Sequence, residues 1–175
     1  KSINKLLHPR HSSGHVLLQG APTGLFQIDH LRTPSDFLLL AQRTLIRCQL
    51  LVQRIARAIG NPSELARVVR NLDRLSDMLC GVIDMAELVR HAHPDQGWAN
   101  AANDAYEYLC NYMNVLNTHT ELYDALRCVM ETKDIYHSLS QEAQAVAHIF
   151  MRDFEKSGIH LPPHERNRFV ELSDQ

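Results

Sequence analysis

Several features that define common protein classes are missing from this sequence. No apolar run approaches the roughly 18–20 residues that cross a bilayer, so we expect no membrane span. The net charge is only −2, from 18 basic and 20 acidic residues, and exerts no global attraction on nucleic acid. What remains is a 175-residue chain with 45% hydrophobic and 22% charged residues, enough for one domain with a core.

The four cysteines form no CxxC pair and no patterned spacing. Zinc sites and small disulfide frameworks favour closer or patterned cysteines, so Cys48, Cys80, Cys110 and Cys128 are predicted to be reduced and mostly buried thiols. Reduced thiols are typical of a reducing compartment.

Acidic residues are absent from residues 1–28, where Lys1, Lys5 and Arg10 are basic. Acid-poor, basic N-termini are a feature of mitochondrial transit peptides, and the first residue is not methionine, which favours a processed or trimmed product. Glycine and proline interrupt any helical period before Thr33, so residues 1–33 are predicted to be an extended arm.

The remainder, residues 34–175, is predicted to be an all-α domain. Thr33-Pro34-Ser35-Asp36 is a helix start, with a capping hydroxyl before proline in the first turn. A loop is expected near Asp134–Leu139, and the other loops are short, which favours an antiparallel up-and-down array. Start and stop signals delimit about six helices, at residues 34–59, 61–92, 95–117, 118–130, 140–158 and 162–175. The last helix has no stop signal before Gln175, so the chain is expected to be a fragment cut in mid-helix.

The stretch from Leu72 to Val89 is predicted to be the central helix. Apolar residues recur at steps of three and four on one face. Gly81 inside the helix costs about 1 kcal/mol against alanine, which is tolerable if another helix crosses closely there. A second face carries Asp73, Asp77, Asp84 and Glu87. Pairing with Arg70, Arg74 and Arg90 at helical spacing would make this face ordinary solvated surface. The alternative is an acidic surface that meets a basic peptide.

No catalytic or metal-ligating residue is predicted in this chain. The segment His164 to Arg168 resembles a zinc-peptidase HExxH helix but has arginine where the second histidine is required. His91 and His93 lie two residues apart without a third ligand, and a di-metal bundle site would need more than the Asp134 and His137 pair.

Longer segments resemble a known family. Three segments are similar to the N-terminal helical region of the mitochondrial intermediate peptidases: LSDMLCGVIDMAELVRHAHPD (75–95), LNTHTELYDAL (116–126) and FEKSGIHLPPHERNRFVEL (154–172). The segment GLFQI (24–28) is similar to the start of the mature folded part of these proteins. These enzymes are thimet-oligopeptidase-like zinc metallopeptidases. The resemblance covers roughly residues 24–175, nearly the whole chain.

The resemblance implies a function for a larger parent protein. In this family the N-terminal helices form a wall of a deep channel, with residues 157–162 as the turn between two wall helices. The zinc-binding HExxH helix lies in the C-terminal half, which has no counterpart here. The implied parent activity is removal of N-terminal octapeptides from imported precursors in the mitochondrial matrix.

The chain alone is therefore expected to be inactive, with the C-terminal catalytic portion and presequence peptides as its partners. Asp73, Asp77, Asp84 and Glu87 are its candidate substrate-facing residues. The alternative is a free-standing helical adaptor that binds a peptide or protein without catalysis. A fragment is expected to leave an apolar face bare along the fourth to sixth helices, whereas an adaptor should have a closed core.

Overall fold

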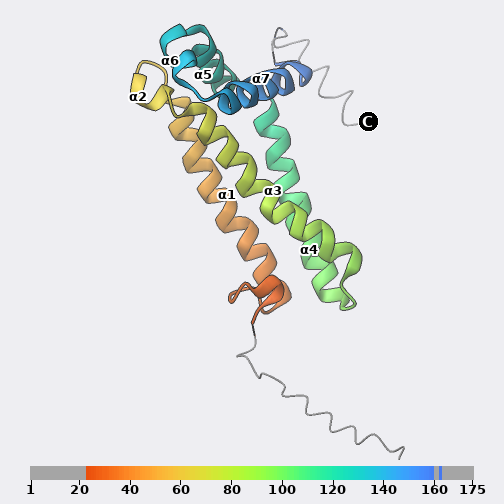
Figure 1. Cartoon of the computed structure of the whole chain (residues 1–175). Helices are drawn as coiled ribbons and strands as arrows, with labels where there is room; N and C mark the ends of the chain where they lie inside the picture. The colour runs from red at the N-terminus through yellow and green to blue at the C-terminus, as the bar shows by residue number, and fades with distance from the viewer. Residues whose placement is uncertain (1–22, 160–161, 163–175) are drawn as a thin grey trace, which may run out of the picture. The chain divides into compact units, whose positions relative to one another are not determined.

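The structure, a computed structural model, describes residues 23–159 and residue 162. The chain divides into two units, Lys1–Arg32 and Thr33–Gln175, and each is considered by itself. The described residues contain α-helices and one 3-10 turn but no strand, which confirms the all-α fold (Figure 1). The α-helices are α1 (Pro34–Ala56), α2 (Pro62–Leu65), α3 (Val68–Ala92), α4 (Gln96–Asn117), α5 (Thr120–Glu131), α6 (Lys133–Ser138) and α7 (Gln141–Lys156). None of them is long and apolar enough to cross a membrane.

The described part of the first unit is a closed turn. It contains the 3-10 turn η1 (Leu25–Gln27), and the backbone N–H of Leu25 donates to the carbonyl oxygen of Leu31 at 2.8 Å. A side chain at Gly24 would collide with the carbonyl oxygen of Ile28, so only glycine fits here. Over these residues the local structure is a turn rather than the extended conformation expected for the arm.

Helix α1 begins where the sequence indicates. The backbone N–H of Thr33 donates to Oδ2 of Asp36 at 2.7 Å, and Pro34 occupies the first turn. The helix ends at Ala56, three residues earlier than expected, and Gly60 completes the turn with φ of 88°. Its buried side chains recur at steps of three and four and therefore form one face. They are Phe37, Ala41, Thr44, Cys48, Val52 and Ile55.

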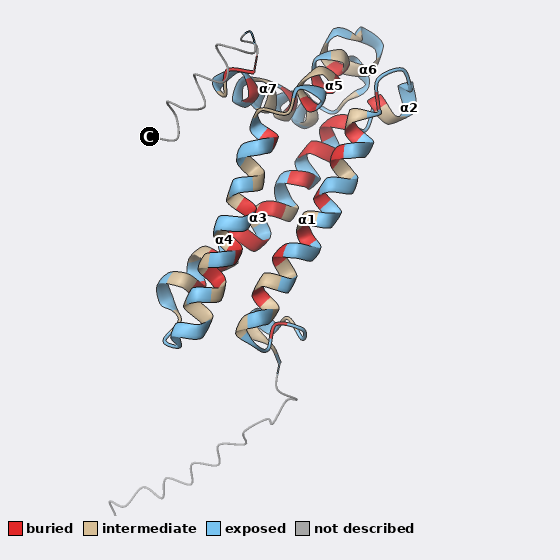
Figure 2. Ribbon diagram, turned by 180° about the vertical axis from the view of Figure 1, so that it is seen from behind, coloured by how far each residue is buried: buried red, intermediate tan, exposed pale blue. Residues whose placement is uncertain are grey.

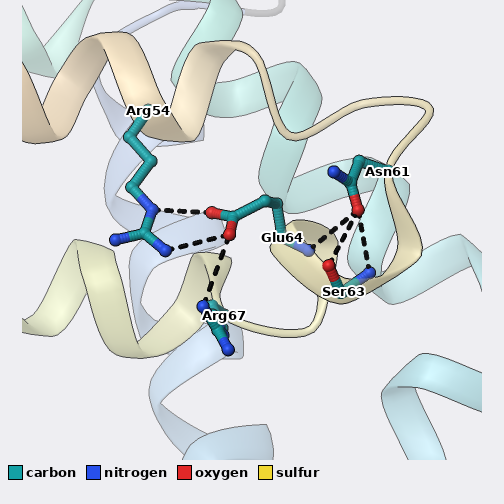
Figure 3. Close-up of polar contacts among 5 residues, drawn as sticks. All are labelled: Arg54, Asn61, Ser63, Glu64 and Arg67. Atoms are coloured by element: carbon teal, nitrogen blue, oxygen red, sulfur yellow. Dashed lines mark hydrogen bonds and ion pairs between the residues drawn. The ribbon is translucent and has the colours of Figure 1, made fainter.

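The prediction of one continuous helix over residues 61–92 is wrong, because α2 ends at Leu65 and α3 begins at Val68. Asn61 caps α2 by accepting hydrogen bonds from the backbone N–H groups of Ser63 and Glu64. Figure 3 shows that the Glu64 carboxylate is held by Arg54 of α1, at 2.6 and 2.9 Å, and by Arg67 at 3.4 Å. These contacts tie α2 to the end of α1, and the chain turns at residues 66–67 before α3 starts.

Helix α3 is the central element, as the sequence predicts, since it packs against α1, α4, α5 and α7. Its expected apolar face is buried, and Figure 2 shows buried residues along the sides where α1 and α3 face each other. No described helix crosses closely at Gly81, because a Cβ atom placed there would meet nothing within 4 Å. Gly81 therefore lies on the solvent side of the helix.

Three long helices and a group of shorter ones make up the second unit. Helices α1, α3 and α4 pack against one another, and the chain reverses direction from each to the next (Figure 1). Helices α5, α6 and α7 gather at the end where α2 lies. Gly158 follows α7 with φ of 72°, as expected for a glycine that closes a helix. The helix expected over residues 162–175 falls outside the described residues, apart from Pro162.

The loop expected near Asp134–Leu139 is instead largely the short helix α6. Side chains of α7 stabilise it. Nε2 of Gln144 donates to the carbonyl oxygens of Tyr136 and Leu139 at 3.2 and 3.1 Å, and the Tyr136 hydroxyl lies 3.0 Å from Nε2 of His148. A six-residue helix is marginal by itself, so these tertiary contacts account for its formation.

Candidate functional site: the acidic face of α3

The predicted acidic residues share one face of α3. At 100° per residue, Asp73, Asp77, Asp84 and Glu87 lie within about 80° of one another, on the side away from the buried face. The three aspartates are exposed and Glu87 is half-buried. We call these four residues the acidic face.

Only one of the expected ion pairs on this face forms. Glu87 accepts from Nε of Arg90 at 2.7 Å, and this hydrogen bond lowers the pKa of Glu87 below its ordinary value. The expected pairing is wrong for Asp73, Asp77 and Asp84, which have no ion pair with any described residue. Exposed pairs gain little in water and lose side-chain entropy, which explains why nearby arginines leave these carboxylates unpaired.

Glu87 belongs to a contact between α3 and α4. The guanidinium of Arg90 lies 4.1 Å from the ring centroid of Tyr106, and its Nη1 donates to Oδ1 of Asn103 at 3.3 Å. Asn103 in turn donates to Glu107 at 2.8 Å. Glu87 therefore orients Arg90 for packing, whereas the three aspartates have no such structural role.

An open groove lies beside Asp73, between the start of α3 and the segment that joins α6 to α7. It has a volume of about 440 Å³. Its charged groups are Asp73, Glu142 and Arg70, none of which has an ion pair with a described residue. The hydroxyl of Ser140 already caps α7 through the backbone N–H of Ala143. The apolar part of the groove is formed by Ala66, Val69, Leu139, Ala143 and Val146.

This arrangement suits the binding of a ligand. Two carboxylates against one guanidinium leave the groove with a net negative charge beside apolar side chains, which fits a ligand with a cationic group and an apolar group, such as a basic peptide. The lining has no cysteine and no histidine, and the hydroxyls of its two serines, Ser138 and Ser140, are engaged.

The histidines considered as metal ligands are engaged elsewhere. Nε2 of His91 lies 3.3 Å from Oε1 of Glu87, and Nδ1 of His93 accepts from the backbone N–H of Asp95 at 3.1 Å. Within residues 23–159, no three histidine, cysteine or acidic side chains gather closely enough to hold a metal ion. The pair Asp134 and His137 lies on α6, and the segment His164 to Arg168 is outside the described residues.

All four cysteines are free thiols, as predicted, but only Cys48 is fully buried. Burial raises the pKa of the Cys48 thiol to about 11. The other three, Cys80, Cys110 and Cys128, are half-buried, so the prediction of mostly buried thiols is only partly correct.

The fold and the candidate site thus define an all-helical domain with an exposed acidic face on its central helix. No family model matches the chain, and no solved structure gives a significant match. Among known proteins, it is similar to mitochondrial intermediate peptidases of three fungi. Identity to the Malassezia globosa protein is 96% over 173 residues, which cover 99% of this chain and 22% of that protein.

The other two relatives are more distant but match most of the chain. Identity to the Mycosarcoma maydis protein is 62%, over 94% of this chain and 19% of that protein. Identity to the Coprinopsis cinerea protein is 60%, over 86% of this chain and 20% of that protein. The resemblance to the N-terminal helical region of the mitochondrial intermediate peptidases is confirmed. The chain spans about a fifth of the length of the relatives it matches.

Proposed function

We propose that this chain is the N-terminal, channel-wall portion of a mitochondrial zinc metalloendopeptidase that removes N-terminal octapeptides from imported precursor proteins in the matrix. The observation that carries the proposal is the 96% identity to a mitochondrial intermediate peptidase over 99% of the chain. The match covers only 22% of the length of that relative, which supports the interpretation that this chain is part of a larger enzyme over the alternative of a free-standing adaptor.

In this proposal the zinc ion is held by the C-terminal portion of the longer enzyme. The described residues do not fit a zinc site, because they bring no three suitable ligands together. The role of this chain is to shape the channel and to bind the peptide that the catalytic portion cleaves.

Zinc analysis and a peptide-cleavage assay test the division of roles. We expect the 175-residue chain to bind no stoichiometric zinc and to cleave no presequence peptide, whereas the longer Malassezia globosa protein should do both. Zinc-dependent turnover by the short chain would contradict the proposal, as would failure of the longer protein to process a presequence.

The acidic face is proposed to attract the basic presequence. Asp73, Asp77 and Asp84 support this role because they are exposed and carry charges that no described residue neutralises. Asp73 also lines the groove, whose apolar residues would receive a non-polar side chain of the same peptide. Glu87 contributes less to this attraction, because its carboxylate is paired with Arg90.

Neutralising the three aspartates in the longer protein tests this role. For Asp73→Asn, Asp77→Asn and Asp84→Asn combined, we expect kcat/KM for basic peptides to fall by roughly three- to tenfold, with the loss shrinking at high salt. Neutral peptides should be cleaved as before. Asp104→Asn on the exposed side of α4 is the control. Unchanged selectivity for basic peptides would make the acidic face ordinary surface.

A further inference from the structure

Helix α1 carries a line of exposed apolar residues opposite its core face. Leu39, Ile46 and Leu50 are 42%, 57% and 62% exposed. At 100° per residue they lie within about 40° of one another and about 180° from the buried residues of the helix. They extend over about 17 Å of the helix at 1.5 Å per residue. We call these three residues the α1 stripe.

The two edges of the α1 stripe differ in charge. One edge carries Arg43, Arg47 and Arg54, and the other carries glutamines at 42, 49 and 53. Arg54 is paired with Glu64, whereas Arg43 and Arg47 have no ion pair with a described residue. No acidic residue occurs between Phe37 and Ser63.

Elsewhere in the described part of the second unit, no helix carries three large exposed apolar residues in line. Ile59 follows α1, Leu88 lies on α3, Tyr108 and Val115 lie seven residues apart on α4, and Ile149 lies on α7. Among the described residues, the longest line of exposed apolar side chains is therefore on α1, and the expected sixth helix lies outside the described residues apart from Pro162. Single exposed apolar residues are normal on a protein surface, but an aligned set edged by polar groups marks an interface.

We propose that the α1 stripe packs against the remainder of the longer polypeptide, on an apolar surface edged by carboxylates that pair with Arg43 and Arg47. This inference rests on the proposed function, since it requires the chain to be part of a larger protein. About four fifths of the length of the Malassezia globosa relative lies outside the matched region, so a covering segment is available there. A second copy of this chain fits less well, because neither edge of the stripe offers a carboxylate to the arginines.

Thiol labelling tests whether the stripe is covered. Ile46→Cys and Leu50→Cys are made in the 175-residue chain and in the longer Malassezia globosa protein, and maleimide adducts are located by peptide mass spectrometry. Because access controls thiol reactivity, we expect labelling at both positions to be at least about tenfold slower in the longer protein. The control is Val115→Cys on α4, at a position 58% exposed, which should change less than about twofold.

Equal rates in the two proteins, or equal slowing at all three positions, would overturn the inference. Labelling of the short chain that slows as its concentration rises would also overturn it, in favour of self-association. Peptide cleavage by the longer protein is measured in parallel. Slow labelling without cleavage rejects the proposed function alone, and cleavage with unchanged labelling rejects this inference alone.

The arginine edge is tested separately. The double substitution Arg43→Glu and Arg47→Glu should lower the thermal midpoint of the longer protein and leave that of the short chain unchanged. The matched control is Arg70→Glu with Arg74→Glu on α3, where both arginines are also exposed and lack an ion pair with a described residue. If the control pair lowers the midpoint of the longer protein as much as the α1 pair does, the proposed carboxylate edge is contradicted.

Discussion

At the scale of single residues, Gly81 and Gly60 are both exposed, and each has open space where a Cβ atom would stand, but their backbones differ. Gly81 has helical backbone within α3, whereas Gly60 has φ of 88°. Gly81→Ala should therefore stabilise the chain by about 0.5–1 kcal/mol, and Gly60→Ala should destabilise it by about 1 kcal/mol. Urea unfolding of both variants measures the difference. Shifts of the same sign would contradict the assigned backbone conformations.

The ion pair between Arg54 and Glu64 should make stability depend on pH. Hydrogen bonds from Arg54 lower the pKa of Glu64, so its folded-state pKa lies below the unfolded value of about 4.3. The pair therefore stabilises the chain above the unfolded pKa, and this contribution is lost as the pH falls through the folded pKa.

Substitution of Glu64 checks that pH dependence. Glu64→Gln should lower the urea midpoint near about pH 7, and the gap from the unmodified chain should close in acid, below about pH 4. High salt should narrow the gap as well. The control, Glu155→Gln, replaces an exposed glutamate of α7 without an ion pair among the described residues. A gap that does not change with pH would contradict the role of the pair.

At the scale of elements, Asp95 is the clearest helix cap. Its Oδ1 accepts from the backbone N–H groups of Gly97 and Trp98 at 2.7 and 3.2 Å. Asp95→Ala should destabilise the chain by about 1 kcal/mol, because two N–H groups of the first turn of α4 lose their acceptor. The control is Asp104→Ala on the same helix, which should have little effect on stability because Asp104 does not cap the helix. Equal losses in thermal unfolding would show that the cap is not responsible.

Helix starts were predictable because their chemistry is local. Thr33 with Asp36, Asp95 and Ser140 each place a side-chain oxygen near the first-turn N–H groups, and a helix begins at each. The break between α2 and α3 and the formation of α6 were missed. Tertiary contacts lie at both places: Arg54 of α1 holds Glu64, and Gln144 of α7 holds the end of α6. Helical periodicity carries no information about such contacts.

At the scale of the whole molecule, α3 joins most of the core. Leu79 is 2% exposed on α3, which contacts four other helices. Leu79→Ala should destabilise the chain by about 2–5 kcal/mol, because it leaves a cavity as well as losing buried apolar surface. Leu88→Ala, on the same helix but 56% exposed, should change stability by no more than about 0.5 kcal/mol. Similar losses in urea unfolding would contradict the assigned burial.

The candidate site was predictable in part. The spacing of Asp73, Asp77, Asp84 and Glu87 predicted that they lie on one face of a helix, and in the structure they lie on one face of α3. The groove was not predictable, because Glu142 and Leu139 lie far along the chain from Asp73 and reach it only through the packing of α7. The absence of ion pairs between the three aspartates and any described residue was also missed, since sequence spacing permits pairing without enforcing it.

The packing around Trp98 gives the molecule a local optical reporter. This is the single tryptophan of the chain, and its ring centroid lies 5.4 Å from that of His93 and 6.4 Å from that of Phe37. It therefore reports on the start of α1 and on the turn that joins α3 to α4. Of the helices at the other end, α5 and α6 carry tyrosine, and none of α5, α6 and α7 carries tryptophan. Selective excitation of the indole would follow the loosening of one end of the helical unit, while tyrosine absorbance would follow both ends.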